Sequence, residues 1–294
     1  MSIDKTRGCP ICSSREASVG FPYATQFSGK KFKYFKCCAC ETVFVDPVPD
    51  NDTFVQMYAK DSYHDCDYDA EVGGTYQESV QLLQSYVGAG ATVLDYGCGL
   101  GGFLKELSAN GFVSFGVEFD VDAVDFTSKN ASCTVWTADN FWSLLPKPKF
   151  DVIHLGDVLE HLPEPAEIVN EILSNLNYGG ILFVEGPLET NPSPVYWVTR
   201  VYGWVKHILR PNFIAKDPPH HLFRINAPQQ LKFFSNRITA PLNLKYWRVY
   251  ETGWPYVEGA LIKRAIAKIA IFFGGKRIIN ATFGNRFQAI FMKK

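Results

Sequence analysis

One stretch of the chain joins a β-branched strand, a glycine-rich turn and a helix without interruption. The strand spans Ala91–Asp95, the turn reads Tyr-Gly-Cys-Gly-Leu-Gly-Gly over 96–102, and a helical pattern follows from Phe103 to Ala109. A turn without bulky side chains lets a ligand approach the backbone at the start of the helix. A second strand, Ser114–Glu118, ends in a carboxylate 19 residues after Gly99. A doubly wound sheet places the carboxylate that holds ribose hydroxyls at this spacing, so the sequence predicts an α/β, Rossmann-like fold that binds a nucleoside.

The same turn limits the kind of nucleoside. The glycines Gly97, Gly99 and Gly101 are not followed by the last glycine of a dinucleotide-binding turn, and the chain has no Gly-Lys-Ser/Thr loop. A cradle for pyrophosphate or triphosphate groups is therefore disfavoured.

Successive segments of the middle of the chain resemble the ordered motifs of class I S-adenosylmethionine-dependent methyltransferases. The matching segments are Val93–Gly101, Gly116–Asp120, Ala138–Asn140, Phe150–Pro165 and Leu176–Leu182. They follow one another over about 90 residues, and such an ordered set is far more specific than a glycine turn. The resemblance implies a doubly wound methyltransferase sheet with S-adenosylmethionine as the cofactor.

The resemblance also implies a role for each residue at a matching position. We expect Asp95, Gly97 and Gly99 to line the methionine part of the cofactor and Glu118 to hold the ribose. The remaining positions would face adenine or close the pocket after the fourth strand: Asp139, Asn140, Gly156 and Asp157. Residues 81–195 carry 15 Asp+Glu against four Lys+Arg, which agrees with a site for a sulfonium cation.

The first 49 residues contain two Cys-x-x-Cys turns. Cys9 and Cys12 form one, Cys37 and Cys40 form the other, and a 24-residue spacer with strand-like segments lies between them. Four thiolates in this pattern predict a zinc ribbon, in which structural Zn²⁺ replaces the core that so small a module lacks. Cys38 is a neighbour that could substitute as a ligand, and disulfide pairing is the alternative.

These patterns suggest three parts of the chain. Residues 1–49 form the zinc-ribbon module, 50–80 form an acidic linker or lid with Tyr58, Tyr63 and Tyr68, and 81–294 form the methyltransferase domain. Within the last part, we expect 186–294 to hold the substrate region.

A histidine pair follows two prolines in the C-terminal third. Pro218 and Pro219 forbid a regular helix, so His220 and His221 are predicted on a loop at the mouth of the sheet. The segment resembles the Pro-x-His-Leu signature of methyltransferases in glycan and secondary-metabolite pathways. Since imidazole has a suitable pKa, we expect His221, and after it His220, to act as the general base. The alternative is a loop histidine bonded to backbone carbonyls.

The segment Glu160-His161 is a further candidate. In similar quinone-pathway O-methyltransferases the matching pair lies near the substrate and is linked to a divalent metal, which implies a catalytic role for His161. The alternative is that His161 caps a helix or bonds the lid.

The C-terminal third is strongly basic. Residues 196–294 carry 17 Lys+Arg against three Asp+Glu, which favours an anionic partner or, alternatively, docking on the acidic middle of the chain. Val195–Arg210 and Gly259–Phe273 both show apolar residues at helical spacing beside Lys and Arg. Such helices suit a membrane interface, or they cover the sheet. The apolar segments Arg277–Phe283 and Phe287–Met292 resemble the antiparallel hairpin that ends this fold.

These expectations combine into one functional hypothesis. The protein would methylate a hydroxyl, or a sugar carbon, of a small or lipid-linked substrate such as a glycan intermediate. An RNA methyltransferase is the alternative, although the Asn/Asp-Pro-Pro-aromatic segment of base-amino methylation is missing after the fourth strand, where Gly156–Leu159 stands, so nucleic acid is disfavoured. A binding module with a relic cofactor pocket is a third hypothesis. Without a signal region or an uninterrupted apolar span, we expect a cytoplasmic protein, with peripheral contact to the inner membrane surface as an option.

Overall fold

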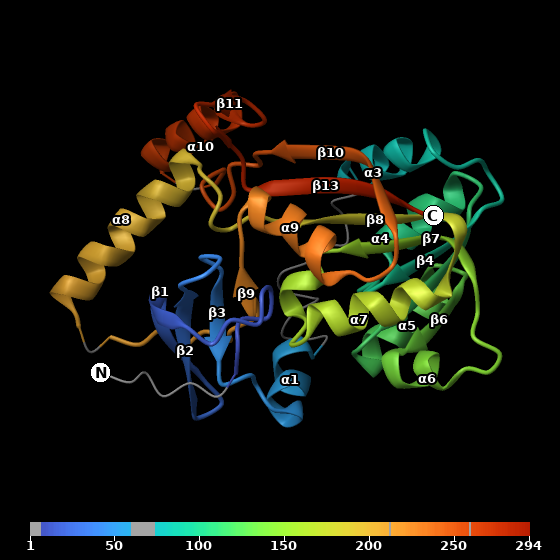
Figure 1. The fold of residues 1–294 in the computed structure, drawn as a ribbon, viewed down its shortest axis with the longest axis horizontal. Coiled ribbons are helices and arrows are strands. Elements are labelled where there is room, and N and C mark those ends of the chain that lie inside the picture. The colour runs from blue at the N-terminus through green and yellow to red at the C-terminus, as the bar shows by residue number, and fades with distance from the viewer. Residues whose placement is uncertain (1–6, 60–73, 212, 259) are drawn as a thin grey trace.

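The computed structural model describes residues 7–59, 74–211, 213–258 and 260–294 (Figure 1). Two of the three tyrosines of the predicted lid, Tyr63 and Tyr68, lie outside these ranges.

Seven strands form the central sheet, in the order β10-β13-β8-β7-β4-β5-β6. Strands β4 to β8 are parallel to one another, whereas β13 is antiparallel to both of its neighbours, β8 and β10. The strands are β4 (Thr92–Tyr96), β5 (Val113–Glu118), β6 (Thr134–Thr137), β7 (Phe150–Gly156), β8 (Leu176–Pro187), β10 (Leu242–Tyr250) and β13 (Arg286–Lys293). The predicted doubly wound Rossmann-like sheet is confirmed.

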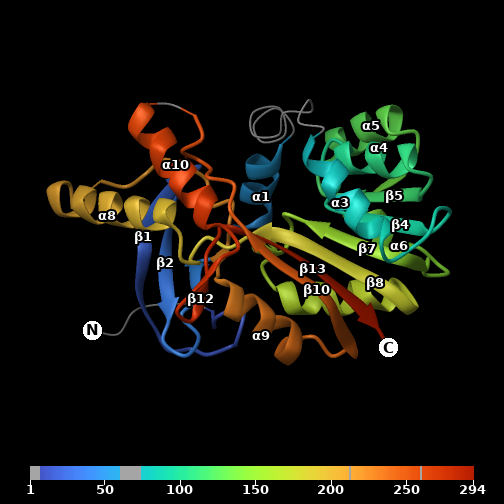
Figure 2. The same ribbon diagram turned by 90° about the horizontal axis from the view of Figure 1, so that it is seen from above.

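Helices cover both faces of this sheet (Figure 2). Successive side chains of a strand point to opposite faces, so Val93 packs with α3, α4 and α5, whereas its neighbour Leu94 packs with α6, α7 and α9. The helices are α3 (Gly74–Gln84), α4 (Gly102–Ala109), α5 (Val121–Asn130), α6 (Ala138–Ser143), α7 (Pro165–Ile172) and α9 (Ala227–Arg237), with the short 3₁₀ turns η1 (Leu159–His161) and η2 (Leu173–Asn175). Buried on both faces, the parallel strands have almost continuous apolar sequences.

A second, four-stranded sheet has the order β1-β2-β3-β9. The first three strands belong to the N-terminal module: β1 (Ala17–Phe27), β2 (Lys30–Cys37) and β3 (Val43–Asp46). The fourth, β9 (Phe223–Arg224), comes from the C-terminal third and pairs antiparallel with β3. Helix α1 (Asn51–Tyr58) follows, and the Asp50 side chain caps it by accepting from the Thr53 amide at 3.1 Å.

The predicted terminal hairpin is wrong in its pairing. Strand β13 pairs with β10, while the segment after α10 forms a separate ribbon of β11 (Arg277–Ile278) and β12 (Ala281–Thr282). Strand β10 lies at the sheet edge and most of its side chains are exposed or only partly buried. It therefore lacks the alternating apolar pattern by which a sequence reveals a strand.

Both predicted amphipathic helices are present, as α8 (Pro194–Leu209) and α10 (Leu261–Phe273). They pack against each other at the end of the molecule that also holds β1 and β2 (Figures 1 and 2). The alternative in which they cover the central sheet is not what the structure shows. In the described part of the chain, no helix has the length and apolarity needed to span a bilayer.

Candidate functional site

The glycine turn lies at the carboxyl end of β4. Gly97 and Gly101 have φ angles of 85° and 79°, in the left-handed region that favours glycine. A Cβ atom on Gly97 would lie 2.5 Å from the Val158 side chain, so a larger residue would displace the turn. The Gly99 amide donates to Oε2 of Glu118 at 2.8 Å, which ties the turn to the end of β5.

All eight residues predicted to bind the cofactor lie along one edge of the sheet. This edge holds the carboxyl ends of β4, β5, β6 and β7, which are neighbours in the sheet. Glu118 is buried, whereas Asp139 and Asn140 are exposed in the first turn of α6. The complete set is Asp95, Gly97, Gly99, Glu118, Asp139, Asn140, Gly156 and Asp157. A doubly wound sheet binds its ligand at this edge.

Asp157 has a partner that the sequence did not reveal. It follows β7 with a φ of 52°, and its two carboxylate oxygens accept from one Arg286 nitrogen at 2.8 and 2.7 Å. The Arg286 Nε also donates to the Tyr250 hydroxyl at 3.2 Å. Because Arg286 begins β13, 129 residues along the chain from Asp157, only the sheet topology brings the two together.

A buried histidine joins two carboxylates beneath the glycine turn. His154 on β7 is 2% exposed; its Nδ1 lies 2.7 Å from Asp95 Oδ1 and its Nε2 lies 3.2 Å from Glu185 Oε1. Burial alone would lower the pKa of His154, but Asp95 and then Glu185 outweigh it and raise the pKa to about 9. Ser79 and Gln288 also donate to Glu185, at 2.9 and 2.8 Å. No local sequence pattern indicates this group, since its contacts join residues far apart in the chain.

The predicted catalytic histidines do come together. The rings of His161 and His221 are 4.9 Å apart between centroids. The His161 Nδ1 lies 2.9 Å from both the Tyr58 hydroxyl and the His220 carbonyl oxygen. Burial and then the charge of His221 hold the pKa of His161 well below its usual range, so its ring is neutral. His220 contributes its backbone to these contacts, while its ring is tilted against that of Tyr58 at 5.8 Å.

His221 has a carboxylate partner that no sequence motif indicated. Its Nδ1 lies 2.9 Å from Oε2 of Glu189, a residue just beyond the end of β8. Burial opposes a charged imidazole, but Glu189 outweighs it and the pKa of His221 is raised. Burial likewise raises the pKa of Glu189, but Arg224 and His221 reverse the effect and bring it to about 2. An ionised Glu189 therefore holds His221, rather than the backbone carbonyl that the alternative hypothesis required.

Glu160 is a buried acid beside these histidines. Burial and then Asp157 raise its pKa to about 8, and its Oε1 has no hydrogen-bond partner among the described residues. Ligand atoms of Glu160, His161 and His221 lie within 4.8 Å of one another. One carboxylate and two imidazoles are a donor set that suits a divalent transition metal.

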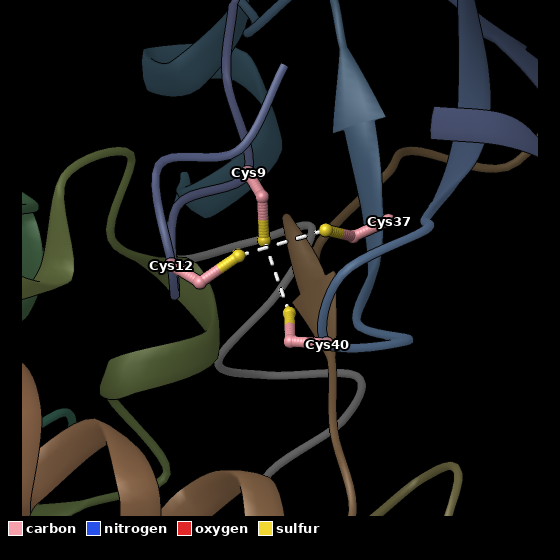
Figure 3. A group of neighbouring side chains, drawn as sticks. All are labelled: Cys9, Cys12, Cys37 and Cys40. Atoms are coloured by element: carbon pink, nitrogen blue, oxygen red, sulfur yellow. Dashed lines mark hydrogen bonds between the residues drawn. The ribbon is translucent and has the colours of Figure 1, made fainter. Parts of the chain in front are cut away.

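The four predicted metal ligands converge in the N-terminal module (Figure 3). The Sγ atoms of Cys9 and Cys40, and those of Cys12 and Cys37, are 3.6 Å apart. Tetrahedral Zn²⁺ with bonds of about 2.3 Å would place its sulfur ligands about 3.8 Å apart, so the residues present fit this ion. In the Cys9–Cys40 pair, the shared hydrogen bond lowers the pKa of Cys40 and raises that of Cys9, so Cys40 is the thiolate of this pair. Cys38 is exposed and lies outside the cluster.

The cysteine module is joined to the histidine loop by a strand pair. Val43 and Phe44 of β3 pair with Arg224 and Phe223 of β9, and the Val45 amide donates to the Leu222 carbonyl at 2.9 Å. His221 immediately precedes this ladder. The cysteine module is therefore bonded directly to the end of the loop that carries His221.

This arrangement defines a class of protein. A doubly wound sheet with a glycine turn, a buried carboxylate on the next strand and an acidic carboxyl edge fits the adenosyl group and the sulfonium of S-adenosylmethionine. The Gly97 turn is closely packed against Val158, and the buried Glu118 accepts from its Gly99 amide. The site is that of a class I S-adenosylmethionine-dependent methyltransferase.

Comparisons with known proteins agree. Residues 68–232 match the family model described as a methyltransferase domain, and the chain belongs to this family. The ubiquinone biosynthesis O-methyltransferase of Paraburkholderia phytofirmans is 35% identical over 156 residues, 50% of this chain and 62% of that protein. Its mitochondrial counterpart in Candida albicans is 32% identical over 129 residues, 40% of this chain and 38% of that protein. The chain thus spans less than two thirds of the length of these relatives.

A solved S-adenosylmethionine-dependent methyltransferase from Methanosarcina mazei is similar in fold. It shares 17% identity and a TM-score of 0.49, over 72% of this chain and 96% of that chain.

Proposed function

We propose that the protein transfers a methyl group from S-adenosylmethionine to a hydroxyl of a small acceptor, with His221 as the general base. The observation that supports this most directly is the Glu189–His221 pair, at 2.9 Å, beside the carboxyl edge of the sheet. The cofactor supplies an electrophilic methyl carbon, so the protein has to orient the acceptor and remove its proton.

The residues at the sheet edge would bind the cofactor as the resemblance implies. Glu118 would accept from the ribose hydroxyls, Asp139 and Asn140 would face the adenine, and Asp95 would lie beside the methionine part. The acidic edge would stabilise the positive charge before transfer.

The Glu189–His221 pair would remove the acceptor proton. In the neutral form of His221, which is reached above its raised pKa, the carboxylate on Nδ1 fixes the ring tautomer and leaves Nε2 as the proton acceptor. The hydroxyl proton would move to Nε2 of His221 and the acceptor oxygen would take the methyl group. The sulfur–methyl bond would break, and the sulfur would keep its electron pair in neutral S-adenosylhomocysteine. Neutral His161 and the Tyr58 hydroxyl would hold the other side of the acceptor site.

A hydroxyl acceptor is favoured by the curated relatives, both of which are named as O-methyltransferases of ubiquinone biosynthesis. Neither name points to a sugar or to RNA. As the acceptor substrate, we therefore rank a small hydroxyl compound of another kind first, a glycan intermediate or a sugar carbon second, and RNA last.

A metal-assisted form of the same reaction is the second candidate. The convergence of Glu160, His161 and His221 favours it, because a divalent cation there would bind the acceptor oxygen and lower its pKa. Titration calorimetry with Mn²⁺ tests this form of the reaction. It is supported if Mn²⁺ binds to the wild type and the Glu160→Gln variant does not bind it. It is excluded if the wild type does not bind Mn²⁺.

We further propose that residues 1–49 form a zinc ribbon whose role is to support the histidine loop. The β3–β9 ladder is the contact that carries this role. Residues 50–80 would link it to the methyltransferase domain of residues 81–294, and α1 would present Tyr58 to the site.

The His221→Ala variant tests the assigned base. We expect turnover of a hydroxylated acceptor to fall by about a hundredfold, while the dissociation constant of S-adenosylmethionine stays within about threefold of wild type. His207→Ala, which removes an exposed imidazole on α8, is the matched control. Unchanged turnover in His221→Ala would exclude His221 as the base.

A further inference from the structure

Most of the exposed large apolar side chains gather on two segments. Of the 26 such side chains in the described residues, 17 lie within 197–213 and 254–279. These segments contain α8, α10 and their adjoining loops, and we call their exposed surface the α8–α10 face. Single exposed apolar residues are ordinary, but a contiguous group marks an interaction surface.

Helix α8 turns its apolar stripe away from the protein. Val198, Val201, Val205 and Ile208 recur at helical spacing and are 38–60% exposed. The opposite side carries Gly203, which lies against the Phe21 ring of β1 so closely that a Cβ there would clash. On the same side His207 stacks on Tyr23 at 4.1 Å. The apolar side of α8 therefore faces outward, whereas a helix that covers a core turns its apolar side inward.

Helix α10 extends this surface. Its small residues Ala267 and Ala270 are buried, whereas Leu261, Ile262 and Phe272 are 81%, 76% and 66% exposed. Since α8 and α10 pack against each other, their exposed apolar side chains belong to one end of the molecule (Figure 2).

The charges around the α8–α10 face are almost all positive. The same two segments contain one acidic residue, Glu258, and eight basic ones: Arg200, Lys206, Arg210, Lys263, Arg264, Lys268, Lys276 and Arg277. Within the described parts of the chain, none of the eight forms an ion pair with a carboxylate. The Lys276 Nζ lies 3.4 Å from the centroid of the Phe272 ring, and the Lys206 Nζ lies 3.9 Å from that of Phe213, so charge and apolar surface are interleaved.

We propose that the α8–α10 face binds the surface of an anionic phospholipid bilayer. Apolar and aromatic side chains would enter the boundary between headgroups and acyl chains, and the basic side chains would pair with the phosphates. A second copy of the chain fits less well, because two faces of eight basic residues and one acidic residue would repel each other. This inference does not depend on the proposed acceptor or base.

The face is continuous with the edge of the sheet that carries the site. Helix α8 begins after β8, whose last residue Pro187 is opposite Arg286, and the segment that leads to α10 begins after Tyr250, which is also opposite Arg286. Both helices thus leave the sheet at its carboxyl edge. A bound bilayer would lie on the same side of the molecule as the acceptor site.

Vesicle sedimentation tests the proposal with the full-length protein. We expect sedimentation with vesicles of phosphatidylcholine and phosphatidylglycerol in equal parts, little with phosphatidylcholine alone, and release at high salt. Ile208→Glu/Phe272→Glu should reduce the bound fraction by about tenfold or more, and so should Lys263→Glu/Lys268→Glu. Leu145→Glu/Tyr178→Glu, which places the same charges on side chains 86% and 88% exposed elsewhere, should bind like wild type.

Three results would overturn the proposal. One is the absence of sedimentation with the anionic vesicles, and another is equal loss of binding in the control variant and the α8–α10 variants. The third is a dimer, seen by sedimentation velocity, that Ile208→Glu/Phe272→Glu dissociates while vesicle binding is absent. The affinity for S-adenosylmethionine, measured in every variant, reports that the fold is intact.

Discussion

At the scale of single residues, His154 is a buried imidazole whose two ring nitrogens both face carboxylates. It lies between Asp95 and Glu185 in the interior of the sheet, and with the imidazole charged the three groups keep one net negative charge. Removing one partner of a buried ionic group leaves an uncompensated charge, which usually costs more than the group contributes when it is complete. His154 thus permits a carboxylate to stand beside the cofactor site without destabilising the core.

The pH dependence of stability should reveal this group. Because the pKa of His154 is raised to about 9 in the folded protein, against about 6.5 for an unfolded chain, its contribution is complete below about pH 6.5 and is lost as the pH rises through 9. We expect His154→Gln to lower the free energy of unfolding by about 3 kcal/mol at pH 6.5. The difference from wild type should shrink towards pH 9 in urea titrations followed by tryptophan fluorescence. His207→Gln should follow wild type, and a constant difference across this pH range would contradict the assignment.

Glu118 is the residue on which cofactor binding should depend most. Its removal takes away the carboxylate proposed to accept from the ribose and also releases the Gly99 amide. We expect Glu118→Ala to raise the dissociation constant of S-adenosylmethionine by at least about tenfold in titration calorimetry, since hydrogen bonds to a charged group contribute about 1.5–3 kcal/mol each. Glu167→Ala removes the same charge from an exposed position on α7 and serves as the control. Normal binding in Glu118→Ala would show that the ribose lies elsewhere.

At the scale of elements, the two-residue strand β9 connects two distant parts of the chain. It adds a piece of the C-terminal third to the N-terminal sheet and lies directly after His221. Arg224 of the same strand is held on one side by the Tyr34 ring, 5.2 Å from its guanidinium carbon, and on the other by Glu189 at 3.5 Å. Order in the cysteine module should therefore be transmitted to the histidine loop.

Cys37→Ser should separate this support from cofactor binding. We expect the variant to lose its bound zinc and at least about tenfold in turnover, because removal of a structural metal loosens the module. Its affinity for S-adenosylmethionine should change little, and the Val45 amide, which donates to Leu222, should exchange hydrogen faster. Cys38→Ser alters an exposed neighbour and should keep metal, turnover and slow exchange. A metal-free Cys37→Ser with full turnover would contradict the supporting role.

Burial distinguishes the strands that could be predicted from those that could not. Strand β4 reads as a short β-branched run because nearly all of its residues are buried between helices. Strand β10, at the edge, has exposed residues at three successive positions, Asn243 to Lys245, and leaves no such pattern. The predicted partner of β13, residues 277–283, was therefore wrong.

At the scale of the whole molecule, acidic and basic residues are concentrated in different parts of the chain. The acidic middle of the chain forms the carboxyl edge with the cofactor site, and some arginines of the basic third return to it, as Arg286 does to Asp157 and Arg224 to Glu189. Eight of the other basic residues lie on α8, α10 and the loops next to them. Docking on the acidic middle of the chain is therefore seen for Arg286 and Arg224, whereas an anionic partner for the α8–α10 face stays a proposal.

The sequence alone determined the class of fold, the order of the central βα units, the four cysteines of the cluster and the edge at which a cofactor would bind. These follow from local patterns: the glycine turn, the buried strands and the cysteine spacing act within a few residues or repeat at a fixed period. Tertiary structure alone decided the partners of the functional side chains, namely Glu189 for His221, Arg286 for Asp157 and the two carboxylates of His154. It also decided that the apolar stripe of α8 faces outward. The physical reason is that these contacts join residues tens to more than a hundred positions apart, and only the packing of the completed sheets brings them within hydrogen-bond distance.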